Sequence, residues 1–249
     1  MSAGLRVATL NIHKGLSQFN RREVIHELRE GLRALDPDLM FLQEVQGLNE
    51  RRALRFASRP RAPQHEFLAG EGWQHAYGRN RVYEHGHHGN AVLSRYPIVS
   101  SENEDVSDHR FERRGLLHCV VSVPGWPRNL HCVCVHLSLH ERGRRRQLDA
   151  IGARLEALAA RDLPIIVAGD FNDWRHRATT ILEERLGMTE VSSIHGRRPG
   201  RTFPSALPLL RLDRIYVRGF HVARAQVHRG APWSRLSDHL AVSAELKRA

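Results

Sequence analysis

Apolar positions along the chain fall into short runs separated by polar loops, and each run has the spacing of one type of secondary structure. Continuous or alternating apolar residues, as in buried β-strands, occupy residues 7–12, 39–45, 90–94, 116–123, 130–137, 165–168, 212–217 and 239–246. Apolar residues recur at helical spacing in 24–35 and 148–158, the pattern of an amphipathic helix. Strands with a few interspersed helices predict an α/β (α+β) protein with two packed sheets flanked by helices.

Polar residues beside the helical segments predict where the helices start and stop. Asn20 and Glu23 resemble a capping box at the start of the first helix, and the Asp36-Pro37 pair ends it because a residue before proline avoids the α region. Asp173 is a candidate N-cap for a short helix that ends near Gly187. Arginines at 142 and 144–146 crowd the start of the second helix, where cations oppose the helix dipole. They either meet an anion or form a solvated basic face.

Charge narrows the class of partner. The 249 residues include 38 Lys and Arg against 27 Asp and Glu, a net charge of +11. This excess favours phosphate-rich partners, either nucleic acid or anionic lipid, although a solubilising surface charge explains it equally well. The length suits one large sandwich, and a single domain over residues 1–249 is expected.

Cysteine count and apolar run length bear on location. Three cysteines, an odd number, indicate no disulfide framework and a reducing compartment. The first residues lack the apolar core of a signal peptide, and no apolar run is long enough for a transmembrane segment. We therefore expect a cytoplasmic protein. Separately, we expect a monomer.

Five polar residues lie at or just past the carboxyl ends of predicted strands: Asn11, Glu44, His136, Asp170 and Asn172. In layered folds such strand ends gather loop-borne side chains above a rigid core. Carboxylate and amide oxygens suit a hard cation, Mg²⁺ or Mn²⁺, that keeps water positions open for phosphate.

Seven short peptides occur in a fixed order along the chain: TLNIHKG, FLQEV, GNAVLSRYPI, VHLSL, VAGDFND, RLDRIYV and LSDHLAV. In this order they resemble the endonuclease/exonuclease/phosphatase superfamily, and the match extends from Asn11 to His239. The resemblance implies a four-layer α/β/β/α sandwich with two mostly antiparallel sheets. It also implies a divalent-metal-dependent phosphoesterase that acts by in-line attack of water.

The resemblance assigns a metal site and a water-activating group. Glu44 is the principal ligating carboxylate for Mg²⁺ or Mn²⁺, and Asn11 and Asp238 complete or support the site. Asp170 orients or deprotonates the attacking water, and Asn172 holds a phosphate oxygen. From the residues alone, Glu44 also fits a surface glutamate, and the Gly-Asp-x-Asn spacing also fits a turn and cap.

The same resemblance implies two catalytic histidines. His239 faces the scissile phosphate while Asp213 accepts its other ring proton, and His136 is the second histidine. Asp213 alternatively forms a salt bridge to Arg211 or Arg214. Two further residues are candidates for substrate-phosphate contacts: Asn90, which is also a candidate partner of His136, and Arg114.

The substrate is less defined than the reaction. The VHLSL peptide resembles the branch with pancreatic-type deoxyribonucleases, sphingomyelinases, inositol polyphosphate phosphatases and deadenylases, rather than AP endonucleases. Arg-rich predicted loops at 58–65, 101–114 and 197–210 suit a polyanion but lack an aromatic row for base stacking. We expect a nuclease acting on DNA or RNA. The alternatives are a phospholipid, sphingomyelin or inositol-phosphate phosphoesterase and a non-catalytic polyanion-binding module.

Two other clusters could bind a soft metal. Cys132, Cys134 and His136 alternate along one strand face, but same-face strand neighbours rarely converge on one tetrahedral ion, and buried cysteines act as small hydrophobes. His85, His87 and His88 are better explained as an exposed histidine-rich loop.

Overall fold

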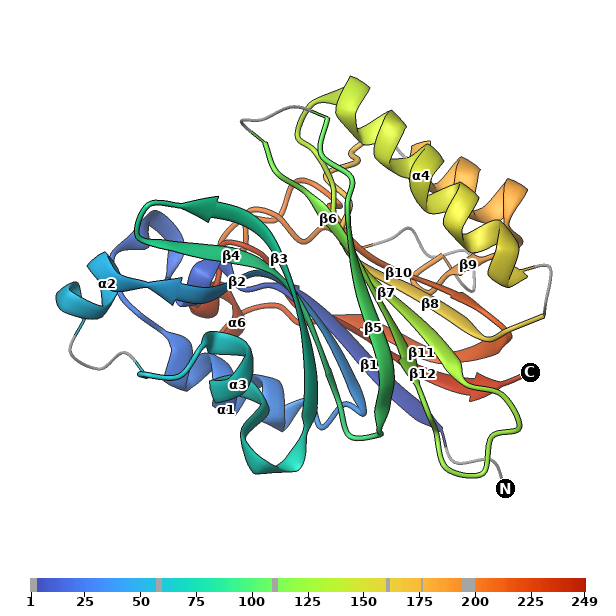
Figure 1. The fold of residues 1–249 in the computed structure, drawn as a ribbon, viewed down its shortest axis with the longest axis horizontal. Coiled ribbons are helices and arrows are strands. Elements are labelled where there is room, and N and C mark those ends of the chain that lie inside the picture. Colours follow the sequence, from blue (N-terminus) through green and yellow to red (C-terminus); the bar gives the residue numbers. More distant parts are fainter. Residues whose placement is uncertain (1–3, 57–59, 109–111, 160–161, 176, 194–199) are drawn as a thin grey trace.

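The computed structural model describes residues 4–56, 60–108, 112–159, 162–175, 177–193 and 200–249. Within these residues the chain forms two six-stranded sheets (Figure 1). The first has the order β11 (Phe220–Val227), β12 (Val242–Arg248), β1 (Leu5–Asn11), β2 (Leu39–Asn49), β4 (Gly86–Ser94) and β3 (Gln74–Tyr83). The second has the order β5 (Ile98–Asp105), β6 (Gly115–Val121), β7 (Leu130–His136), β8 (Ile165–Asp170), β10 (Asp213–Arg218) and β9 (Thr189–Glu190).

Each sheet has one parallel pair, β1 with β2 and β7 with β8, and its other pairs are antiparallel. The central strands are apolar on both faces because both faces are covered. In β2, Phe41 points into the core between the sheets, whereas the neighbouring Met40 and Leu42 face the helices. All three cysteines are buried and free within the inter-sheet core.

Helices cover the outer face of each sheet, which confirms the four-layer sandwich (Figure 1). α1 (Ile25–Ala34), α3 (Gln64–Ala69) and α6 (Trp233–Leu236) pack on the first sheet. α4 (Glu141–Ala159), α5 (Arg177–Thr179) and the π-helical turn η4 (Thr180–Arg185) pack on the second. The remaining helices among the described residues are α2 (Glu50–Arg55), η1 (His13–Gly15), η2 (Gln18–Asn20) and η3 (Gly70–Gly72). No helix among the described residues is long and apolar enough to span a bilayer.

The strands that the apolar pattern did not predict lie at sheet edges. β3, β5, β9 and β11 each have one neighbour, and most residues of β5 are exposed. Because an edge strand is half-solvated and often charged, its apolar alternation is weak. The predicted loop 101–114 is therefore wrong for 101–105, which belong to β5, while 109–111 lie outside the described residues.

Some local predictions also need correction. α1 starts after Val24 without a side-chain cap, and Asn20 lies in η2 with φ +56°, so the predicted capping box is wrong. His87 and His88 belong to strand β4 and are half-buried rather than in an exposed loop, and His87 Nδ1 lies 3.0 Å from the Tyr77 hydroxyl. Residues 58–59 and 197–199 of the other predicted loops lie outside the described residues.

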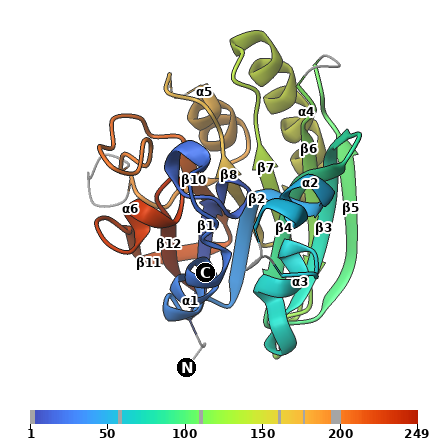
Figure 2. The ribbon, with the colours of Figure 1, turned by 90° about the vertical axis from the view of Figure 1, so that its left-hand side faces the viewer.

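Strand direction gathers the polar motifs at one end of the sandwich, which we call the loop end. β1, β2, β7 and β8 end there, and their antiparallel neighbours β4, β6, β10 and β12 begin there. In Figure 2 the segment after β1 (blue) lies between the loop before β10 (orange) and helix α2 (cyan). Loops distant in sequence thus meet at the loop end.

Candidate active site

Strand register aligns three of the predicted residues at the loop end. His136 of β7 pairs with Asp170 of β8, which pairs with Asp213 of β10. Residues directly opposite one another on neighbouring strands project from the same side of the sheet. The three side chains therefore form a row across the second sheet, with Asp170 in the middle.

Asp170 is almost completely buried and is contacted on both carboxylate oxygens. Oδ2 accepts a hydrogen bond from Asn11 Nδ2 at 3.2 Å and lies 3.4 Å from His136 Nε2 and 3.8 Å from His239 Nε2. Oδ1 accepts a hydrogen bond from the backbone N–H of Asn172 at 3.0 Å. Burial raises the pKa of Asp170 to about 6, so the carboxylate is ionised at neutral pH but more basic than a surface aspartate.

His239 is bound from its other side by Asp213. The Nδ1 atom of His239 lies 2.8 Å from Asp213 Oδ2, and the backbone N–H of Asp213 donates a hydrogen bond to Thr202 Oγ1. Burial alone would lower the pKa of His239, but the carboxylates of Asp213 and Asp170 outweigh it and raise the pKa to about 10. His239 is therefore an imidazolium at neutral pH.

His136, in contrast to His239, is neutral at neutral pH. Its side chain is 8% exposed. Burial, together with the guanidinium of Arg114, holds the pKa of His136 well below its ordinary value. Asp170 thus lies between a neutral histidine and a charged one. Neighbouring titratable groups whose pKa values are pushed apart in this way are typical of acid–base sites.

The turn after β8 sets the position of Asn172. Gly169, the second-last residue of β8, has φ +149°, and a Cβ atom there would lie 1.9 Å from the carbonyl oxygen of Val135, so only glycine fits. Asn172 adopts a left-handed conformation with φ +48° and donates a hydrogen bond from Nδ2 to the Leu137 carbonyl at 2.9 Å. This contact ties the β8 turn to the end of β7.

The three predicted metal ligands meet around the turn formed by His13 and Lys14. Asn11 Oδ1 accepts a hydrogen bond from the His13 backbone N–H at 3.1 Å. Asp238 Oδ1 lies 3.3 Å from His13 Nδ1, and Glu44 forms an ion pair with the Lys14 ammonium. The side chains of Glu44 and Asp238 keep 20% and 24% of their surface exposed. They are therefore open to a ligand from solvent.

Glu44 is ionised at neutral pH. Burial would raise its pKa, but the Lys14 ammonium, with smaller contributions from His136 and His13, holds the pKa well below its ordinary value. An amide oxygen with two carboxylates is the hard-oxygen donor set that Mg²⁺ and Mn²⁺ prefer. By donor chemistry, Asn11, Glu44 and Asp238 fit such an ion.

A second acidic cluster has suitable spacing for a metal. The ligand atoms of Asp170, Asp213 and His239 all lie within 4.8 Å of one another and are buried. However, both ring nitrogens of His239 face carboxylates, and its Nδ1 is within hydrogen-bond distance of Asp213. We interpret this cluster as a charged hydrogen-bonded group rather than the metal site.

The side chains of Asn90 and Arg114, the two predicted phosphate contacts, are engaged by other groups of the protein. Asn90 Nδ2 donates hydrogen bonds to the carbonyls of Gly115 and Cys134, and its Oδ1 has no partner among the described residues, so it does not bind the ring of His136 as predicted. Arg114 donates to the Leu137 carbonyl and pairs with Glu112.

The alternative in which Asp213 pairs with Arg214 is wrong. Arg214 is fully buried and pairs with Asp173, whose Oδ2 also accepts a hydrogen bond from the backbone N–H of Ala178. Asp213 instead bonds His239. The predicted capping role of Asp173 is thus partly supported, because its carboxylate binds the start of α5.

The sequence did not assign His13, Lys14 or Gln64 to the site. Gln64 of α3 is buried, donates to the Lys14 carbonyl at 2.8 Å and accepts from the Gln46 backbone N–H at 2.8 Å, which fixes the His13–Lys14 turn. His13 and Lys14 both have positive φ. The only sequence signal for this turn was a histidine and a lysine before Gly15, directly after the strand that ends in Asn11.

Comparisons with known proteins place this arrangement in a family. The sequence matches the family model described as Endonuclease/Exonuclease/phosphatase family over residues 8–239. It is 45% identical over 242 residues to the uncharacterized protein YbhP of Escherichia coli (strain K12), covering 97% of this chain and 95% of that protein.

Solved structures show the same fold. The catalytic domain of human nocturnin, solved with a bound sulfate anion, has a TM-score of 0.75 at 19% identity, covering 100% of this chain and 97% of that one. The mannosyl-6-phosphatase Bt3783 of Bacteroides thetaiotaomicron has a TM-score of 0.73 at 18% identity, covering 98% and 99%. The solved structures agree in fold, and the family match identifies this chain as a member of the endonuclease/exonuclease/phosphatase family, and thus as a metal-dependent phosphoric ester hydrolase.

Proposed function

We propose that the chain hydrolyses phosphodiester bonds by in-line attack of water and that Asp170 is the group that activates this water. The observation that carries the proposal is the position of the Asp170 carboxylate, within 4 Å of both the neutral His136 and the charged His239. With a pKa of about 6, Asp170 is ionised at neutral pH and basic enough to accept a proton from a water molecule.

The two histidines would have different roles. His239, charged through Asp213, would stabilise the negative charge that develops on the phosphoryl oxygens or supply a proton to the leaving oxygen. His136, held neutral, would donate a hydrogen bond without adding charge. Asn172, fixed by the Leu137 carbonyl, would orient a phosphate oxygen.

Asn11, Glu44 and Asp238 would hold the divalent ion, for which we propose Mg²⁺ or Mn²⁺. When bound, such an ion neutralises charge on the phosphoryl group and orients it for attack. Asn11 also donates a hydrogen bond to Asp170, so one side chain links the ion's ligands to the group that activates water. These ligands and the catalytic residues therefore work at one site.

The first substrate class to test is nucleic acid, because the net charge of +11 favours a polyanion. A non-catalytic binding module is disfavoured because the predicted catalytic side chains lie together at the loop end. Asp170, Asn172, Asp213 and His239 are hydrogen-bonded there, and His136 Nε2 lies 3.4 Å from Asp170. Phosphomonoesters are a second substrate class to test, because one protein with the same fold is named a mannosyl-6-phosphatase. That likeness concerns the fold alone.

The test is a substrate panel with Mg²⁺ or Mn²⁺: bis-p-nitrophenyl phosphate, plasmid DNA, RNA, phospholipid and inositol phosphates. Asp170→Asn should abolish turnover of every substrate that the wild type cleaves, whereas Asp162→Asn, which changes an exposed aspartate just before β8, should retain it. Absence of hydrolysis by the wild type would contradict the proposed activity. Hydrolysis retained by Asp170→Asn would contradict the role of Asp170.

A further inference from the structure

Exposed large hydrophobic side chains are concentrated at the loop end. The described residues include ten such side chains, and Val99 alone lies at the other end, near the start of β5. The remaining nine we call the apolar rim: Phe19, Leu48, Leu54, Val82, Leu139, Trp174, Leu207, Leu209 and Leu210. Scattered exposed hydrophobics are normal, but a set confined to one end of a molecule marks an interaction surface.

The strand directions explain why these residues share one end. Phe19, Leu139 and Trp174 lie on the connections that follow β1, β7 and β8, each of which ends at the loop end. The segment 207–210 precedes β10, which begins there. Leu48 and Val82 lie near the ends of β2 and β3, and Leu54 in α2 follows β2. The rim therefore belongs to the same loops that carry the catalytic residues.

Arginines outnumber carboxylates between these apolar tips. Among the described residues of the loop-end connections and α2, eight arginines are exposed: Arg21, Arg22, Arg51, Arg113, Arg175, Arg201, Arg229 and Arg235. Four of them form ion pairs, Arg22 with Glu27, Arg51 with Glu84, Arg113 with Asp105 and Arg175 with Glu141, and the other four have no carboxylate partner among the described residues. Arg21 lies over the ring of Phe19 at 5.5 Å, and Arg144 lies over Trp174 at 4.6 Å. Apolar tips interspersed with arginines match a surface that is apolar beneath an anionic layer.

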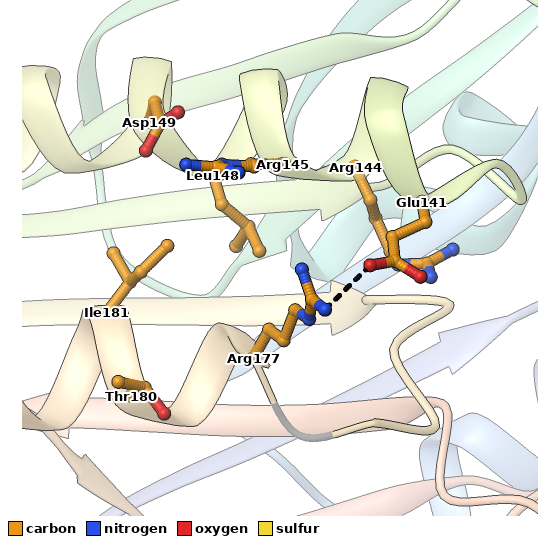
Figure 3. Close-up of a pocket in the computed structure, with 8 residues that line it drawn as sticks. All are labelled: Glu141, Arg144, Arg145, Leu148, Asp149, Arg177, Thr180 and Ile181. Carbon is orange, nitrogen blue, oxygen red and sulfur yellow. Dashed lines mark ion pairs between the residues drawn. The ribbon is translucent and has the colours of Figure 1, made fainter.

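A basic cavity adjoins this rim. It has a volume of about 350 Å³ and lies between α4 and the segment of α5 and η4 (Figure 3). Leu148 and Ile181 line its apolar side. Its three arginines, Arg144, Arg145 and Arg177, outnumber its two carboxylates, Glu141 and Asp149, and Arg177 is paired to Glu141. Because α4 begins two residues after Leu139 and Arg144 contacts Trp174, the cavity extends the positive charge directly behind two rim tips.

We propose that the loop end docks on an anionic phospholipid bilayer, with the apolar rim entering the interface and the arginines binding phosphate headgroups. Seven of the nine rim residues are aliphatic, and aliphatic tips can insert beside acyl chains but cannot stack on bases as nucleic-acid binding requires. Through the proposed function, this docking would place a phospholipid phosphodiester at Asp170. The docking itself needs no turnover and is measured separately.

The test is co-sedimentation of the protein with vesicles of phosphatidylcholine, with and without phosphatidylglycerol. Wild type should bind the anionic vesicles, and Leu207→Asp combined with Leu209→Asp should weaken binding by roughly tenfold or more. Val99→Asp is the matched control for the single change Leu209→Asp, because Val99 is 55% exposed and Leu209 56% exposed, at opposite ends, and each change adds one negative charge. This control should bind as wild type does, and all proteins should hydrolyse bis-p-nitrophenyl phosphate equally.

Two results would overturn the docking proposal. The first is absence of vesicle binding by the wild type, whether or not it binds DNA or RNA, and the second is an equal loss of binding in the Val99 and Leu207/Leu209 variants. Thermal unfolding of each variant checks that the fold is intact. Hydrolysis of the water-soluble diester without vesicle binding would leave the proposed function standing while the docking proposal fails. Vesicle binding without hydrolysis would do the reverse.

Discussion

The Nδ1 atom of His239 lies 2.8 Å from Asp213 Oδ2, while its Nε2 atom faces Asp170 Oδ2 at 3.8 Å. The Asp213 carboxylate thus fixes the orientation of the ring. Both carboxylates are negatively charged and favour the protonated ring, so His239 stays protonated although it is buried. Since the pKa of His239 is about 10, loss of this proton should limit activity only at alkaline pH.

Replacing Asp213 should move that alkaline limit. Asp213→Asn removes the carboxylate that raises the pKa of His239 most, so this pKa should fall. The alkaline loss of activity should then begin at a lower pH than in the wild type. The pH dependence of kcat/KM with bis-p-nitrophenyl phosphate measures this shift, along with an expected loss of roughly a hundredfold at neutral pH. An unchanged alkaline limit would argue against the pairing.

Asp170 should set the acidic limit. Its pKa of about 6 is raised above the ordinary value, so the carboxylate becomes protonated and inactive as the pH falls below about 6. Asp170→Asn should reduce kcat by about a thousandfold or more while the folded state persists. The far-ultraviolet circular dichroism spectrum provides the structural control. An enzyme fully active well below pH 5 would contradict the role of Asp170 as base.

Lys14 should compete with the metal ion for Glu44. The ammonium occupies the carboxylate in the ion pair, so Lys14→Met should tighten Mg²⁺ or Mn²⁺ binding, by roughly tenfold. Isothermal titration calorimetry measures this affinity without turnover. Lys247, exposed on β12, is the chain's other lysine, and Lys247→Met removes the same charge away from the site. Weaker metal binding by Lys14→Met would show that Lys14 assists the ion instead.

Gly169 should tolerate no side chain. Gly169→Ala would force a Cβ atom against the Val135 carbonyl, so we expect the free energy of unfolding to fall by roughly 2–4 kcal/mol. Gly72→Ala is the control, since a Cβ atom there meets nothing within 4 Å. Urea denaturation of both variants tests this, and equal stabilities would show that the β8 turn relaxes at little cost.

The sequence allowed the core strands to be predicted because they are buried on both faces and so carry long apolar runs, as in 39–45 and 130–137. Edge strands such as β5 were not predicted because they are exposed to solvent and carry charged residues, such as Glu102 and Glu104, where a buried strand would be apolar. Local capping also misled, since Asn20 lies in a left-handed turn rather than at a helix start.

For the site, ordered motifs carried most of the information. Asp170, Asp213 and His239 were identified from their peptides, and the structure brings them together through strand register and a hydrogen bond. The place of Lys14 on Glu44 was not predictable, because it depends on two left-handed residues and on Gln64 from a distant helix. Contacts set by tertiary packing leave little trace in local sequence.

The transfer of oxygen from water to phosphorus tests the central claim most directly. Bis-p-nitrophenyl phosphate should be hydrolysed by the wild type in water labelled with heavy oxygen, with Mg²⁺ or Mn²⁺ or with a chelator, and the products examined by mass spectrometry. We expect the label in p-nitrophenyl phosphate, none in p-nitrophenol, and no reaction with the chelator. Label in p-nitrophenol, or labelled product formed at an equal rate with the chelator, would contradict metal-dependent attack of water on phosphorus.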